Sequence, residues 1–225
     1  IASGDYIAFL DSDDLFLPEK LELQLRYMME NEYDVSHTSY ELIDRRTNEI
    51  IQTVHSAKFC GDVFPAIIQE CPICPSTFMI KRSLLHKLDE PFNPRFSIGE
   101  DVCFFIDIAY RYIIGGIDTV LTRMRRDECS AAANLEKQRQ GFLNIISHIM
   151  SREEYYLHEK ELANLVAGFN SMFISNGERV GFWNSEQINI EEKRLSLYRY
   201  FMERKYFPKV SIIIPVYNGA NYLRD

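Results

Sequence analysis

Short apolar runs separated by polar turns predict a series of strands in the first half of the chain. The first run is almost continuously apolar and stops abruptly at a group of acids, which is typical of a buried parallel strand. A polar turn at 44–48 separates two further runs and predicts a hairpin. The runs that we expect to form strands are 6–11, 34–43, 49–54, 75–80 and 117–124.

Helical spacing of apolar residues appears between these runs and dominates after residue 134. Leu21, Leu25 and Met28 recur at i, i+4 and i+7, and they predict an amphipathic helix over about 18–31 that packs its apolar stripe on the sheet. Strand signals vanish between 134 and about 205, where we expect two or three helices. The alternation predicts an α/β fold, with a partial Rossmann-like sheet, flanking helices and a later helical segment.

Three aspartates directly follow the first predicted strand, at the end where open α/β sheets bind ligands. Asp11, Asp13 and Asp14 would repel one another, and a divalent cation would compensate their charge. Ligands that are all oxygen suit Mg²⁺ or Mn²⁺, which commonly takes one or two carboxylates together with substrate phosphates. The alternative is an acidic turn in which Asp13 or Asp14 caps the next helix.

Composition narrows the classes of protein. A formal net charge of -8 over 225 residues argues against a nucleic-acid partner, which would need a basic face. Five scattered cysteines favour a reducing, cytoplasmic compartment, and the Cys71–Cys74 spacing lacks the second pair that a zinc site would need. No apolar run reaches the roughly 18 to 20 residues that span a bilayer, and peripheral membrane association stays open.

The run GDYIAFLDSDDLFLPEKLE (residues 4–22) resembles the middle of a family 2 glycosyltransferase of the GT-A fold. The resemblance implies that Asp11 and Asp13 are its Asp-x-Asp pair, which holds a nucleotide diphosphate sugar through Mg²⁺ or Mn²⁺. It also implies an inverting transfer from this donor to a hydroxyl of a glycan or lipid-linked acceptor. Assembly of bacterial polysaccharides is the expected setting.

A second acidic pair, Glu100 and Asp101, follows the segment FNPRFSIG and begins a predicted helix. The resemblance implies that Asp101 is the catalytic base and that Glu100 orients the base or the acceptor. A carboxylate within hydrogen-bond reach can take the proton that an attacking hydroxyl must lose. The alternative is helix capping, which needs only one such acid.

Arg123 and Arg125 belong to a locally basic patch after the predicted strand 117–124. Arginines there could meet the negative charge of the diphosphate and help it leave. Pairing with nearby surface acids is the equally weighted alternative.

The last residues resemble the opening strand and first loop of the same family, in which that loop contacts the nucleotide. Pro215, Tyr217 and Asn218 would then be nucleotide contacts. We therefore expect a fragment of a tandem enzyme: the C-terminal part of one GT-A domain (1–130), a helical linker (131–207) and the first strand of a further GT-A domain (208–225). Strand 210–216 could complete the sheet beside 6–11 within one chain, or by strand exchange in a homo-oligomer.

Two other functions remain open from the sequence. A haloacid-dehalogenase-like phosphatase also places Asp-x-Asp after a strand and would use Asp11 as its nucleophile, although we find no matching downstream lysine and acidic pair. A non-catalytic linker or docking fragment of a larger glycosyltransferase is the second alternative.

Overall fold

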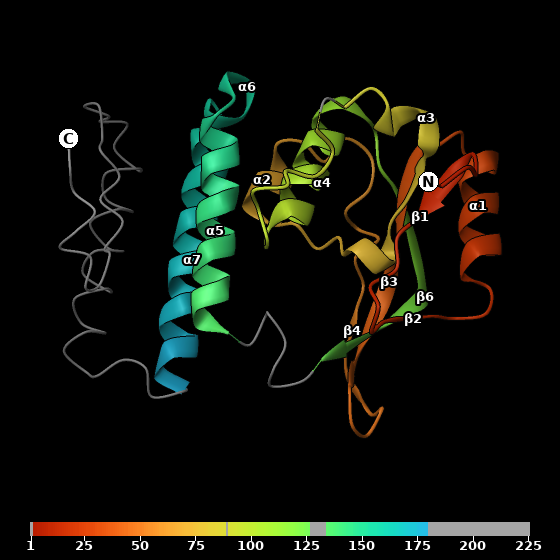
Figure 1. Cartoon of the computed structure of the whole chain (residues 1–225), viewed down its shortest axis with the longest axis horizontal. Coiled ribbons are helices and arrows are strands. Elements are labelled where there is room, and N and C mark those ends of the chain that lie inside the picture. The colour runs from red at the N-terminus through yellow and green to blue at the C-terminus, as the bar shows by residue number, and fades with distance from the viewer. Residues whose placement is uncertain (1, 89, 127–133, 180–225) are drawn as a thin grey trace.

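The computed structural model describes residues 2–88, 90–126 and 134–179, which form a mixed sheet with helices on both faces (Figure 1). The α/β fold expected from the sequence is confirmed. In chain order the elements are β1 (Tyr6–Ala8), β2 (Leu15–Phe16), α1 (Lys20–Glu30), β3 (Val35–Asp44), β4 (Ile50–Val54), α2 (Ala66–Gln69), the 3₁₀ helix η1 (Pro75–Thr77), β5 (Met79–Lys81), α3 (Arg82–Leu85), α4 (Glu100–Arg111), β6 (Gly115–Arg126), α5 (Leu135–Met150), α6 (Glu153–Tyr156) and α7 (Glu159–Arg179).

Strand β3 is the centre of the sheet. The strand order is β1-β5-β3-β6-β2, and β4 pairs with β3 as the predicted hairpin. Only the β3–β6 pair is parallel among the described strands. The C-terminal ends of β3 and β6 therefore meet at one edge of the sheet, and β2 pairs there with Thr122 and Arg123 of β6.

The strand expected over 6–11 is shorter and differently paired than the apolar run suggested. Strand β1 covers three residues, is half-buried, and pairs antiparallel with β5, so the prediction of a buried parallel strand is wrong for the described residues. Its position at the end of the strand order gives it one described neighbour, which explains why its residues are not fully buried. The strand expected over 75–80 begins as a 3₁₀ helix at Pro75.

Helix α1 forms where its apolar spacing predicts, but its buried face matches the predicted stripe only at Met28. Lys20, Gln24 and Met28 are buried, whereas Leu21 is 51% exposed. The Lys20 ammonium donates to the Gln24 side chain and to the carbonyl of Thr77, at 3.3 Å from the latter. These internal partners allow polar residues to occupy the sheet-facing side of the helix.

Helix α4 is the main core helix and lies between the sheet and the pair α5 and α7 (Figure 1). Seven of its consecutive residues, from Cys103 to Ala109, are buried, and they include the charged Asp107. Ile149 of α5 and Tyr155 of α6 belong to the same hydrophobic cluster as residues from α2, β5 and α4. The later helices thus pack directly onto the sheet-bearing part of the chain.

The helical segment expected from residue 134 is present as α5, α6 and α7. Asn134 caps α5, because its side-chain oxygen accepts the backbone N–H of Lys137 at 3.0 Å. No helix among residues 134–179 or earlier in the described chain is long and apolar enough to cross a membrane. The expected division into domains stays a prediction, and the strand expected at 210–216 lies outside the described residues.

Candidate active site

The acidic turn after β1 is fixed by Ser76, which lies 65 residues further along the chain. The backbone N–H of Asp11 donates to the Ser76 hydroxyl at 3.0 Å, and that hydroxyl donates to Asp14 Oδ2 at 2.6 Å. The turn is closed by a hydrogen bond from the Asp14 N–H to the Asp11 carbonyl at 3.1 Å. Asp14 is 8% exposed. Asp14 therefore anchors the turn, while Asp11 and Asp13 are left for other contacts.

Two arginines contact Asp13, one from strand β6 and one from the turn after β3. Arg125 Nη1 of β6 donates to the Asp13 carbonyl at 2.6 Å, and the Arg125 backbone N–H donates to Asp14 Oδ1 at 3.1 Å. Arg45, in the turn after β3, lies 3.6 Å from Asp13 Oδ2, and both side chains of this ion pair are about half-exposed. Parallel pairing places the carboxyl ends of β3 and β6 at the same edge, and the two arginines there bring positive charge to the acidic turn.

The other predicted arginine has a partner of its own. Arg123 Nε donates to Glu41 Oε2 at 2.8 Å across the β3–β6 pair. This contact is the surface pairing that the sequence left as an alternative. A role for Arg123 or Arg125 in binding a diphosphate stays a prediction.

The second acidic pair begins helix α4. Gly99 is the N-cap residue and has a left-handed backbone with φ of 79°, a conformation that favours glycine. Asp101 Oδ1 accepts the backbone N–H of Val102 at 2.8 Å. Burial, followed by the negative charge of Glu100, raises the pKa of the Asp101 carboxyl above its ordinary value. A partly buried carboxylate with a raised pKa is typical of a general base.

An aromatic cluster joins the end of β1 to the start of α4. The Phe9 ring lies 6.0 Å from that of Phe104 and 5.8 Å from that of Phe92, and Phe92 stacks on Phe104 at 4.7 Å. Phe9 is two residues before Asp11, and Phe104 is three residues after Asp101. This packing brings the two acidic segments to the same place.

The pKa of the Asp11 carboxyl is also affected by the nearby acidic side chains. Desolvation, followed by the charges of Asp101 and Asp13, raises the pKa of the Asp11 carboxyl. Two other predicted site residues, Asp13 and Asp101, therefore lie within electrostatic range of Asp11. Pro215, Tyr217 and Asn218 lie outside the described residues.

The chemistry of the side chains fits a hard divalent cation held by few protein ligands. Asp11 and Asp13 offer carboxylate oxygens, and no group of three or more potential ligand side chains occurs within the described ranges. Burial raises the pKa of the nearby Cys74 thiol to about 12, so it stays protonated and is a poor metal ligand. Two carboxylates leave the remaining positions for phosphate oxygens and water, as Mg²⁺ commonly requires.

Ser76, Arg45 and the structural role of Asp14 were missed by the sequence analysis. Ser76 and Arg45 have no local pattern that marks them, because their contacts to the acidic turn span dozens of residues. For Asp14, one signal was available in the sequence. A turn at the end of a strand needs hydrogen-bond partners for its backbone N–H groups, and an aspartate in that turn can help to supply them.

Comparisons with known proteins agree on one family. Residues 1–89 match the family described as "Glycosyl transferase family 2". A glycosyltransferase of Rickettsia bellii is 44% identical over 151 residues, which are 67% of this chain and 21% of that protein. The Escherichia coli protein named "UDP-Glc:alpha-D-GlcNAc-diphosphoundecaprenol beta-1,3-glucosyltransferase WfgD" is 28% identical over 166 residues, covering 70% of this chain and 61% of that protein.

A solved structure with the same fold is that of Staphylococcus aureus TarS 1-349 in complex with UDP-GlcNAc. It matches with a TM-score of 0.58 and 19% identity, covering 83% of this chain and 54% of that chain. This likeness shows the fold alone. The chain spans only 21% to 25% of the length of three Rickettsia relatives. The family and relatives reported above are glycosyltransferases, and they lend no support to the phosphatase alternative.

Proposed function

We propose, on the premise that the chain belongs to glycosyltransferase family 2 through residues 1–89, that it forms the part of a sugar-transferring enzyme that binds the donor diphosphate and activates the acceptor. The observation that carries this proposal is the contact of the Phe9 and Phe104 rings at 6.0 Å, which brings the acidic turn with Asp11 to the start of α4 with Asp101. A UDP-sugar is the proposed donor, because the names of WfgD and of the TarS complex contain UDP-Glc and UDP-GlcNAc.

Asp101 is the proposed catalytic base. It takes the proton from the acceptor hydroxyl as the hydroxyl oxygen attacks the anomeric carbon, and the bond from that carbon to the diphosphate oxygen breaks. The attack from the opposite side inverts the anomeric carbon, and UDP leaves with the electron pair. Glu100 orients the base or the acceptor.

Asp11 and Asp13 are the proposed ligands of Mg²⁺ or Mn²⁺, which when bound would stabilise negative charge on the diphosphate. Arg125 holds the backbone of Asp13 and so fixes the direction of the turn. We assign nucleotide contacts to Pro215, Tyr217 and Asn218, and further diphosphate contacts to Arg123 and Arg125, as part of the same proposal. A cytoplasmic enzyme that meets a lipid-linked acceptor by peripheral membrane association is consistent with the lipid named in WfgD.

Calorimetric titration of the chain with UDP and GDP, with and without Mn²⁺, tests the donor site. We expect UDP binding that depends on Mn²⁺ and weakens at least tenfold in Asp13→Ala, because that substitution removes one of two carboxylate ligands. Asp34→Ala is the matched control, since Asp34 is an acid of similar exposure that pairs with Lys81 at the opposite end of β3.

Equal binding by Asp13→Ala and the unmodified chain would contradict the metal role of Asp13. A folded chain that binds neither nucleotide would contradict the proposed donor site and favour the non-catalytic docking fragment.

A further inference from the structure

Helix α5 runs along α4 and contacts the loop that leads into the helix of the proposed base. Its approach begins at two glycines, Gly141 of α5 and Gly99 at the N-cap of α4. A Cβ atom added at Gly99 would lie 2.9 Å from the Gly141 carbonyl oxygen, and one added at Gly141 would lie 3.3 Å from Ile98 Cγ1. A larger residue at Gly99 would therefore clash with the backbone of α5, whereas one at Gly141 would press on the Ile98 side chain.

One turn further along α5, Asn144 holds the same loop by a hydrogen bond. Its Nδ2 donates to the Ile98 carbonyl at 2.9 Å, and its Oδ1 accepts from Gln140 Nε2 at 3.0 Å. Asn144 is 9% exposed, so this amide is removed from water and its two partners fix its orientation.

The loop that Asn144 holds leads directly into the first turn of α4. Ile98 is followed directly by Gly99, the N-cap residue of α4. The Gly99 carbonyl oxygen accepts the backbone N–H of Cys103 at 3.2 Å. The same turn contains Asp101, whose carboxylate accepts the Val102 N–H. A displacement of the Ile98 carbonyl therefore moves the start of the helix and the carboxylate on it.

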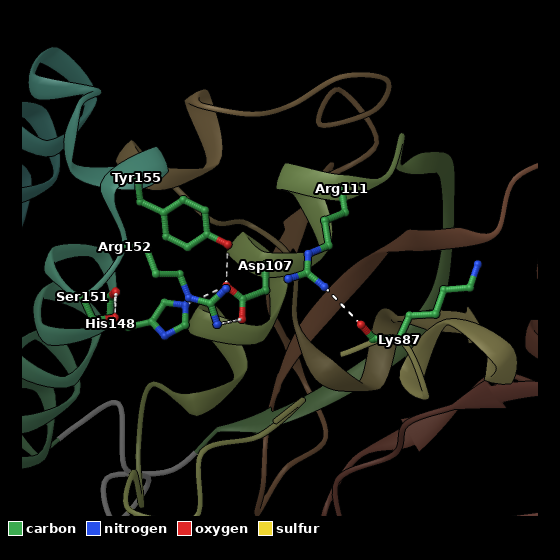
Figure 2. A network of polar contacts seen from close by, with 7 residues as sticks. All are labelled: Lys87, Asp107, Arg111, His148, Ser151, Arg152 and Tyr155. Atoms are coloured by element: carbon green, nitrogen blue, oxygen red, sulfur yellow. Dashed lines mark hydrogen bonds and ion pairs between the residues drawn. The ribbon is translucent and has the colours of Figure 1, made fainter. Parts of the chain in front are cut away.

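A second anchor keeps α5 from turning about this contact. His148, one turn after Asn144, places Nε2 at 2.8 Å from Asp107 Oδ1 near the end of α4. Figure 2 shows the Asp107 carboxylate surrounded by His148, Arg152 and Tyr155. Successive turns of α5 thus form hydrogen bonds first to the loop before α4, through Asn144, and then to α4 itself, through His148.

We propose that Asn144 is a positioning residue for Asp101, acting through the Ile98–Gly99 loop, and that Gly141 provides the close approach this requires. The inference rests on the proposed function, in which Asp101 is the base. A base that must reach the acceptor proton is sensitive to small displacements, because a shift of about 1 Å can cost roughly 100-fold in rate.

Asn144→Leu tests the hydrogen bond with a side chain of similar size. We expect kcat, measured as UDP release from UDP-GlcNAc with water as the acceptor, to fall about 10- to 100-fold, while the KM for this donor and the Mn²⁺-dependent binding of UDP change less than about twofold. Asn164→Leu is the matched control, because Asn164 on α7 makes an exposed hydrogen bond to Gln69. Hydrogen exchange should quicken at the Val102 and Cys103 amides in Asn144→Leu only.

A pair of glycine substitutions separates positioning from stability. Gly141→Ala and Gly168→Ala both favour helix formation, but an added Cβ meets Ile98 at Gly141 and nothing within 4 Å at Gly168. We expect Gly168→Ala to keep the kcat of the unmodified chain and Gly141→Ala to lower it several-fold. A loss of kcat without a loss of thermal stability would not arise from a merely structural role.

Unchanged exchange at Val102 and Cys103 in folded Asn144→Leu overturns the proposal, as does an unchanged kcat in both Asn144→Leu and Gly141→Ala. Equal losses in Asn144→Leu and Asn164→Leu would also overturn it. If the unmodified chain neither binds UDP with Mn²⁺ nor releases it, the proposed function fails, and the exchange measurement still decides whether Asn144 holds the start of α4.

Discussion

The three aspartates of the acidic turn lie in different surroundings. Asp14 is enclosed and accepts hydrogen bonds from the Ser76 hydroxyl and the Arg125 backbone, so it stabilises the turn. Asp11 is partly buried, and this burial, followed by the charges of Asp101 and Asp13, raises the pKa of its carboxyl. Residue type and spacing alone do not show which aspartate anchors the turn. Burial and hydrogen-bond partners identify it as Asp14.

Replacement of the proposed base by Asp101→Asn should abolish proton removal while keeping the size of the side chain. We expect kcat to fall about 100- to 10,000-fold, with UDP binding in the presence of Mn²⁺ preserved. The measurement is UDP release from UDP-GlcNAc as a function of pH. Since the base acts when deprotonated and its pKa is raised, activity of the unmodified chain should already decline above the ordinary titration range of aspartate as the pH falls.

Asp62→Asn serves as the control, because Asp62 is exposed and lies in the segment before α2. If the activity of Asp101→Asn declined at the same low pH as that of the unmodified chain, Asp101 would not be the titrating base. An unchanged kcat in Asp101→Asn would rule it out as well.

At the scale of elements, helix α1 shows how a correct helix can be assigned the wrong buried face. Of its predicted stripe, Met28 is buried, but Lys20 and Gln24 take the buried positions expected of Leu21 and Leu25. Gln24 Nε2 lies 3.1 Å from the Ser36 and Thr77 carbonyl oxygens, and these acceptors come from segments remote in sequence. Periodicity reports where apolar residues recur, but it contains no information on polar partners supplied by other elements.

The buried amino group of Lys20 should make the free energy of unfolding depend on pH. Burial lowers the pKa of Lys20 to about 7, well below the ordinary lysine value near 10.5. Between these values the unfolded chain binds a proton that the folded chain does not, so stability is lost as the pH falls from about 10.5 toward 7. We expect Lys20→Met to remove a slope of up to about 1.4 kcal/mol per pH unit from the free energy of unfolding.

Denaturant unfolding at several values between pH 7.5 and 9.5 measures this slope. Lys81→Met is the comparison variant, since Lys81 is an exposed lysine that pairs with Asp34. Parallel stability curves for Lys20→Met and the unmodified chain would show that Lys20 is not titrated in this way.

At the scale of the molecule, the sequence predicted what depends on neighbours in the chain. The hairpin at 44–48, the helix that begins at Glu100 and the helices after residue 134 all follow from local patterns. The contacts that assemble the site are non-local: Ser76 on the acidic turn, Arg45 on Asp13 and Asn144 on the loop before α4. A single sequence gives no register between distant segments, so these contacts could not be predicted from it.

Helices α5 and α6 contact α4 through the buried carboxylate of Asp107. Burial alone would raise the pKa of the Asp107 carboxyl, but hydrogen bonds from His148 and Tyr155 and the charge of Arg152 outweigh it, and the pKa lies below the ordinary value. A carboxyl of this kind contributes stability above its unfolded pKa, and that stability is lost as the pH falls through the folded-state pKa. The contacts to α5 and α6 should therefore be strongest at neutral pH.

We expect Asp107→Asn to lower the free energy of unfolding by about 3 kcal/mol at pH 7, because it leaves Arg152 without its buried partner. The difference from the unmodified chain should shrink below about pH 4, where aspartate in the unfolded chain takes up its proton, and vanish below the folded-state pKa. Denaturant unfolding at pH 7 and pH 3 measures the full difference and its reduction in acid. Asp118→Asn removes an exposed aspartate that pairs with His55 at 2.9 Å, and it should have little effect at either pH. Equal losses in the two variants would mean that the Asp107 contacts add no more than an exposed pair, and that apolar packing alone holds α5 and α6 against α4.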